Sequence, residues 1–143
     1  MNRRNICLNG EWNFMPDYEN KLPEQLIGEC IYDKEKIRVP SSFRWVIKKD
    51  FEYQPYDVFK YPEKWNEASA GIIAREFYVE VKKGERAFLI FKGILQRWKL
   101  YINNTFITES SESFVTTEID ITDYVNNNVF AQYVKVILKN MLR

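Results

Sequence analysis

An alternation of apolar and polar residues with a period of two constrains the fold of this chain more than any other feature. In the stretch Arg97–Ile102 every second residue is apolar, beginning with Trp98. This spacing predicts a half-buried β-strand with Trp98 in the core, which we favour over stacking of Trp98 on a ligand. The pair Asn103-Asn104 tolerates positive φ, and the alternation resumes in Thr105–Thr108. The whole stretch therefore predicts a β-hairpin.

Further strands are predicted on both sides of this hairpin. They are expected at residues 10–14, 36–39, 75–82, 87–91, 114–121 and 134–139. Residues 87–91 are apolar throughout, which predicts burial on both faces of that strand. No segment longer than about ten residues shows a helical repeat of 3.6. About eight strands joined mostly by short turns predict an all-β protein, a two-sheet β-sandwich of the jelly-roll type.

Length and charge narrow the class of protein. With 143 residues, 45% of them hydrophobic, the chain is expected to form one domain over residues 1–143 around one core. Its net charge of +1 gives no field that favours nucleic acid or an anionic membrane. No apolar run resembles a secretion signal or a membrane span, so we expect a cytoplasmic protein. The chain stops at Met141-Leu142-Arg143, directly after the last predicted strand, and we expect it to be a fragment of a longer protein.

The residue types present exclude several kinds of chemistry. The chain has no histidine, which excludes Ser-His-Asp and Cys-His nucleophile systems and HExxH metal sites within it. Its two cysteines, Cys7 and Cys30, form no CxxC motif. We therefore expect two reduced, buried thiols, with no metal and no cofactor.

Six short segments follow one another in a recognisable order. They are Leu8–Phe14, Ile37–Phe43, Ala70–Phe77, Gly84–Gly93, Tyr101–Asn104 and Glu118–Val125. Their order and spacing resemble those of the amino-terminal sugar-binding-type domain of family 2 glycoside hydrolases, over most of the chain. The resemblance implies a galactose-binding-like jelly roll that is a non-catalytic part of a β-galactosidase-like or β-glucuronidase-like enzyme.

The same resemblance implies the partners of the chain. In this family the catalytic glutamates lie on a separate (β/α)₈ barrel, so no catalytic residue is expected here. Retaining hydrolysis needs two carboxyl groups roughly 5–5.5 Å apart. The expected partners are the barrel and other domains of the same parent chain, together with carbohydrate, and the parent is expected to be a homo-oligomer. We interpret Asp120 and Asp123 as turn-capping residues; a catalytic dyad of the two is the alternative.

Two residues are candidates for contact with sugar. In the β-galactosidase branch an acidic residue after the hairpin contributes to the galactose subsite, and the equivalent position here is Glu112. A carboxylate suits this task because it accepts hydrogen bonds from neighbouring sugar hydroxyls. Asp57 is the nearest equivalent of a second contact, at a position where the branch has an amide side chain. The glucuronidase branch has a glycine pair and a tyrosine near Glu112, so the acidic residue favours β-galactosidase.

The segment between Pro40 and Ala70 is longer than an ordinary loop and rich in aromatic residues. The aromatic residues are Trp45, Phe51, Tyr53, Tyr56, Phe59, Tyr61 and Trp65. We expect Trp45, Tyr53, Tyr56, Tyr61 and Trp65 to pack against the barrel or a neighbouring subunit, with stacking on sugar as the alternative. Two other functions stay open at this point: an autonomous carbohydrate-binding module and a stand-alone protein-interaction domain.

Overall fold

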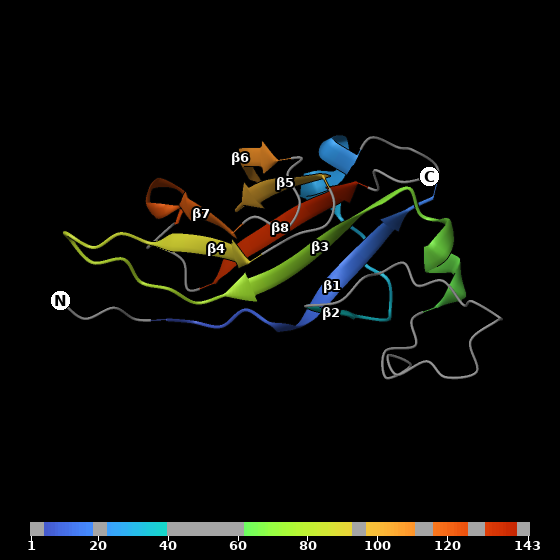
Figure 1. Ribbon diagram of the computed structural model, residues 1–143, viewed down its shortest axis with the longest axis horizontal. Coiled ribbons are helices and arrows are strands. Elements are labelled where there is room, and N and C mark those ends of the chain that lie inside the picture. Colours follow the sequence, from blue (N-terminus) through green and yellow to red (C-terminus); the bar gives the residue numbers. More distant parts are fainter. Residues whose placement is uncertain are drawn as a thin grey trace.

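A computed structural model of the chain describes residues 5–18, 23–39, 62–92, 97–110, 116–125 and 131–139 (Figure 1). These ranges contain eight β-strands, three short 3₁₀ helices and no α-helix. The strands are β1 (Gly10–Asp17), β2 (Ile37–Val39), β3 (Ala70–Phe77), β4 (Phe88–Lys92), β5 (Arg97–Ile102), β6 (Thr105–Ser110), β7 (Thr116–Asp120) and β8 (Gln132–Lys139). The helices are η1 (Pro23–Glu29), η2 (Glu63–Glu67) and η3 (Thr122–Tyr124). The expected all-β class is confirmed.

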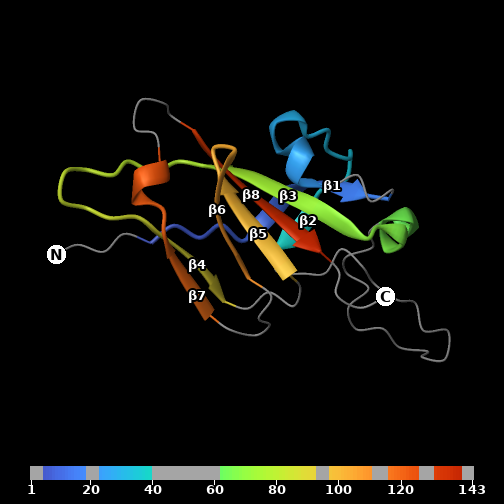
Figure 2. The ribbon, with the colours of Figure 1, turned by 90° about the horizontal axis from the view of Figure 1, so that it is seen from above.

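The described strands form two antiparallel sheets. One has six strands in the order β2-β1-β3-β8-β5-β6, and the other consists of β4 and β7. Figure 1 shows β1, β3 and β8 side by side, and Figure 2 shows η1 and the β4–β7 pair on opposite sides of the large sheet. The two-sheet arrangement was expected from the sequence, whereas the jelly-roll connectivity stays a prediction.

The strand register places the main core between the two sheets. In the large sheet, Ile73 of β3 is paired with Phe14 of β1 and with Val136 of β8, so these side chains point to the same face. Leu89 and Ile119 are the buried pair of the small sheet, and they belong to the same cluster. Fifteen buried residues within the described ranges form this cluster. Burial of this apolar surface is the main stabilising contribution to the fold.

The hairpin predicted from the sequence is confirmed. Asn103 and Asn104 have φ values of 48° and 66° and connect β5 to β6. The Asn103 side chain also fixes the turn to β8: its Nδ2 donates to Gln132 Oε1 at 2.7 Å, and its Oδ1 accepts from the Tyr133 amide at 2.9 Å. Trp98 is 3% exposed and meets Phe91 edge-on, so its predicted core position is correct.

The predictions for two strands differ most from the structure, one in extent and the other in burial. The strand expected at 75–82 is β3, which ends at Phe77 and begins at Ala70, because its apolar first half lies between β1 and β8. Residues 87–91 are not buried on both faces, since Phe88 and Ile90 are 49% and 51% exposed. Among the described strands β4 pairs with β7 alone, and Phe88 and Ile90 lie on the outer face of this pair, opposite to Leu89. A continuous apolar run does not by itself distinguish these cases.

Trp65 was expected at an interface, and this was wrong. It is 0% exposed and belongs to the main core. Helix η2 places its ring edge-on to Phe14, with centroids 4.6 Å apart, and its Nε1 donates to Asp33 Oδ2 at 2.7 Å. The other aromatic residues of the long segment lie outside the described residues.

The expectation of two buried thiols was also wrong. Both cysteines are free, but Cys7 is exposed and Cys30 is half-buried. Cys30 lies just after η1 and its Sγ donates weakly to the carbonyl oxygens of Leu26 and Ile27 at 3.4 Å. The cysteine therefore closes the end of η1.

Candidate functional site

Both residues predicted to contact sugar lie outside the described residues. In sequence, Glu112 falls between the end of β6 at Ser110 and the start of β7 at Thr116. Asp57 falls between the end of β2 and the start of η2. Their roles stay predictions.

The described residues form a groove that sequence reasoning missed. Its volume is about 560 Å³, and it lies on the face of the large sheet turned away from the main core. The floor contains Ala74, whose small side chain leaves room above the strands, and the rim includes residues 28–30 and the hairpin turn. Its main polar side chains are Glu11, Asn13, Glu29, Lys36, Glu76 and Tyr133.

Two cations of the groove are bound to backbone oxygens. Lys135 is 8% exposed, and its Nζ donates to the Ile27 carbonyl oxygen at 2.6 Å, which ties η1 to the sheet. Arg75 Nη1 donates to the carbonyl oxygens of Leu8 and Asn9 at 2.6 and 2.9 Å. Lys135 therefore contributes positive charge to the groove, whereas Arg75 is paired with the core residue Val134 and its side chain holds residues 8 and 9 from the opposite face of the sheet.

Two exposed tyrosines share one carboxylate at the end of the groove. Tyr133 Oη donates to Glu76 Oε1 at 2.9 Å, and Tyr78 Oη donates to Glu76 Oε2 at 3.3 Å. Tyr133 and Tyr78 are 44% and 52% exposed. The hydrogen bond to Glu76 raises the pKa of Tyr133 above its ordinary value, so its phenol stays neutral at physiological pH. Glu76 thus holds two aromatic rings at the surface.

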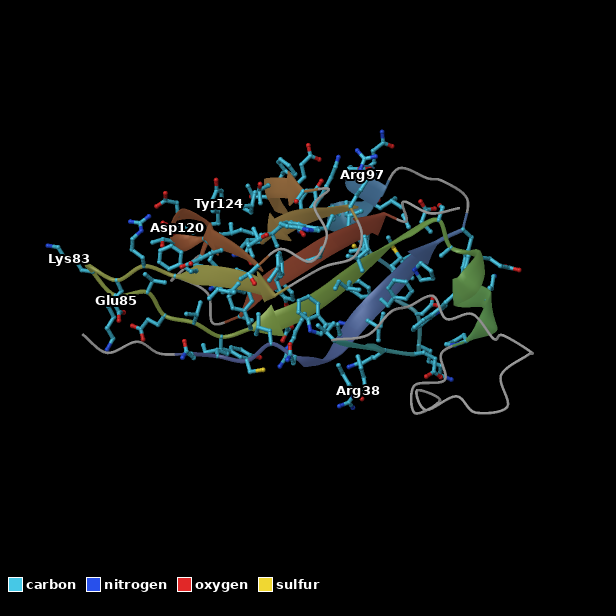
Figure 3. The ribbon with its side chains drawn as sticks, in the orientation of Figure 1. Arg38, Lys83, Glu85, Arg97, Asp120 and Tyr124 are labelled. Atoms are coloured by element: carbon cyan, nitrogen blue, oxygen red, sulfur yellow. The ribbon has the colours of Figure 1, made fainter. Side chains whose placement is uncertain are left out.

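Asp120 has the structural role that the sequence predicted. Its Oδ1 accepts hydrogen bonds from the Thr122 hydroxyl at 2.6 Å and the Thr122 amide at 3.0 Å, at the start of η3 (Figure 3). Its Oδ2 accepts from Arg86 Nε at 2.7 Å. These bonds, the Thr122 hydroxyl first, lower the pKa of Asp120 to about 2. The carboxyl is therefore ionised at neutral pH, which does not suit the general acid of a catalytic dyad with Asp123.

We predict that Asp120→Asn removes a pH-dependent contribution to stability. The pKa of about 2 in the folded chain lies below the ordinary value of 3.8, so this contribution is present above 3.8 and is lost as the pH falls towards 2. Urea midpoints of the wild type and the variant should differ at about pH 5 and come together as the pH falls through about 2. Thr122→Ser keeps the hydroxyl and should follow the wild type. A constant difference across this range would show that Asp120 is not the titrating group.

Two features are absent from the described part of the chain. No helix within it is long and apolar enough to cross a membrane. No group of three or more acidic or cysteine side chains within it is placed to hold a metal ion.

The two packed antiparallel sheets define a β-sandwich domain. The sequence model of "Glycosyl hydrolases family 2, sugar binding domain" matches residues 6–140, nearly the whole chain. The chain therefore belongs to this family of domains, as the six segments suggested.

Similar proteins with curated names are β-galactosidases. The chain is 27% identical over 133 residues to "Beta-galactosidase" of Priestia megaterium, and 27% identical over 135 residues to that of Alteromonas mediterranea. The matches cover 82% and 85% of this chain. They span only 13% of the length of either relative.

Similar solved structures are β-glucuronidases. A structure of "Uncultured Clostridium sp. Beta-glucuronidase" matches 95% of this chain and 22% of its own chain, with a TM-score of 0.73 and 23% identity. The Ruminococcus gnavus β-glucuronidase in complex with uronic isofagomine matches 96% of this chain and 21% of its own, with a TM-score of 0.71 and 24% identity. At this identity the likeness concerns the fold.

Proposed function

We propose that this chain is a non-catalytic domain of a family 2 glycoside hydrolase that completes the sugar site of its parent enzyme. The observation that carries this proposal is the match of the family's sugar-binding domain to residues 6–140. The parent reaction would be retaining hydrolysis of terminal β-glycosides, performed by carboxylates on a barrel domain of the same chain. The proposal includes that residues 1–143 form a single domain and that the barrel and the other domains belong to further parts of the parent chain.

The chemistry of the described residues supports a non-catalytic role. The sequence has no histidine, and the Asp120 carboxylate accepts hydrogen bonds from Thr122 and Arg86. Asp120 therefore serves the turn into η3 instead of proton transfer. Catalysis by the parent then needs groups that another domain supplies.

A β-galactoside is the substrate class that we propose for the parent. The curated relatives reported above are named β-galactosidases, and the structural neighbours, named β-glucuronidases, bear on the fold alone. Glu112 stands at the acidic position implied for the galactosidase branch, and Asp57 remains the second candidate contact. A homo-oligomeric parent in the cytoplasm belongs to the same proposal.

Free monosaccharides are expected to bind the 143-residue chain weakly. The chain offers the galactose subsite only one or two polar contacts, so dissociation constants should be no tighter than the millimolar range. Titration calorimetry with galactose, glucuronic acid and mannose measures this. A micromolar constant would instead favour an autonomous carbohydrate-binding module, the alternative function.

A further inference from the structure

We propose that the groove on the outer face of the large sheet is a second binding site, for a neutral saccharide. In this site Tyr133 provides the surface on which a sugar ring stacks, and the carboxylates of Glu11 and Glu29 accept hydrogen bonds from its hydroxyls. The ligand class rests on the proposed function, but the site requires neither Glu112 nor another domain.

The dimensions of the groove suit a small ligand. Its volume of about 560 Å³ lies within the range of roughly 300–1,000 Å³ that is usual for small-molecule sites. Its floor is a rigid sheet, since β3 is hydrogen-bonded to both β1 and β8 beneath it. Lys135 fixes the wall formed by η1 through its bond to Ile27. The groove is therefore formed before a ligand arrives.

The charges of the groove favour a neutral ligand. Glu11, Glu29 and Glu76 contribute three negative charges, and Lys36 and Lys135 contribute two positive charges. The small excess of negative charge disfavours an anion, and the two lysines reduce what a cation gains. A polyhydroxylated neutral molecule uses the individual donors and acceptors instead.

Suitable acceptors are available at the surface. Glu11 and Glu29 are exposed, and in the described part of the chain neither carboxylate takes part in a hydrogen bond or an ion pair. Ionised carboxylates accept strong hydrogen bonds and can serve two neighbouring hydroxyls at once. The amide of Asn13, which is half-buried and also lines the groove, offers both a donor and an acceptor.

The aromatic surface is held in place before binding. Tyr133 is 44% exposed, and the hydrogen bond from its hydroxyl to Glu76 fixes the ring at the rim. A ring that is already oriented loses less conformational entropy when a ligand covers it. The apolar face of a pyranose ring can then pack on the tyrosine while its hydroxyls reach the carboxylates.

The test is a titration of the ¹⁵N-labelled 143-residue chain, followed by the amide chemical shifts. The probes are lactose and cellobiose as neutral saccharides and glucuronic acid as the charged comparison. Concentrations reach about 50 mM, which is well above a millimolar dissociation constant. We expect saturable shifts at Ala74, Asn104 and Tyr133 with a neutral disaccharide, and smaller shifts with glucuronic acid.

Variants identify the stacking surface. Tyr133→Ala should weaken binding about fivefold to tenfold, as expected for a central aromatic contact. Tyr124→Ala removes another exposed tyrosine, on η3, and should leave binding unchanged. Glu11→Gln keeps the shape of the groove and should weaken binding without disturbing the spectrum of the free chain.

Several outcomes would overturn the proposal. Groove amides that do not shift with any probe would remove the site, and equal affinity in Tyr133→Ala would remove the stacking role. A preference for glucuronic acid would contradict the neutral class. Shifts confined to residues 110–116 would place sugar near Glu112 instead, which would leave the proposed function intact and overturn this site alone.

Discussion

Replacing Trp65 with alanine is expected to lower the free energy of unfolding by about 3–5 kcal/mol. The Trp65 side chain is fully buried, packs edge-on against Phe14 and donates a hydrogen bond to Asp33. Its removal leaves a cavity in the main core. It also removes the hydrogen bond that the Asp33 carboxylate accepts from Trp65 Nε1. Domains of this kind are stable by roughly 5–15 kcal/mol, so the loss is a large part of the total. Urea denaturation measures the difference.

Trp65→Phe is the matched control for this prediction. Phenylalanine keeps most of the buried aromatic surface but cannot donate to Asp33, so it should recover most of the loss. If Trp65→Ala unfolds at the same urea concentration as the wild type, Trp65 is not part of the core, and the interface position first expected for it would be restored.

Local patterns predicted those parts of the fold that depend on neighbouring residues. The β5–β6 hairpin followed from alternation and from Asn103-Asn104, because turn geometry and strand pairing are set within about a dozen residues. The burial of Trp65 did not follow, because it depends on Phe14 and Asp33, which are far away in sequence. The exposure of Phe88 and Ile90 depends equally on which strands cover them.

The groove could not be predicted from the sequence for the same reason. Glu11, Glu29, Glu76 and Tyr133 come from four separate segments and meet only through strand register and the position of η1. In their strands Glu11, Glu76 and Tyr133 occupy outward positions of an alternating pattern, which indicates solvent exposure and nothing more, and Glu29 ends η1. The hydrogen bond between Glu76 and Tyr133 depends on the β3–β8 register, which places these two residues opposite each other.

Replacing Glu112 with glutamine in the parent enzyme is expected to lower kcat/KM for a β-galactoside about ten- to a hundredfold. In the proposed role the Glu112 carboxylate accepts hydrogen bonds from sugar hydroxyls. These hydrogen bonds strengthen in the oxocarbenium-like transition state. Loss of one charge-assisted hydrogen bond costs about 1.5–3 kcal/mol, which corresponds to this decrease. The melting temperature should stay nearly unchanged.

Glu109 and Glu118 provide internal controls for Glu112. Glu109 lies in β6, 3.6 Å from Lys99 Nζ, and Glu118 lies within β7 opposite Ile90. Glutamine at either position should leave kcat/KM unchanged, because neither residue belongs to the connection between β6 and β7. Unchanged kinetics in Glu112→Gln would make this residue a solvated surface glutamate and remove the main residue-level support for a β-galactoside.

The most direct test of the non-catalytic role is a comparison of the 143-residue chain with the whole parent protein. Both are assayed for hydrolysis of aryl β-galactosides and aryl β-glucuronides. We predict turnover by the parent and none by the chain, because the two catalytic carboxylates are proposed to lie on the barrel. Turnover by the purified chain that persists after contaminating host enzyme is removed would contradict a non-catalytic role.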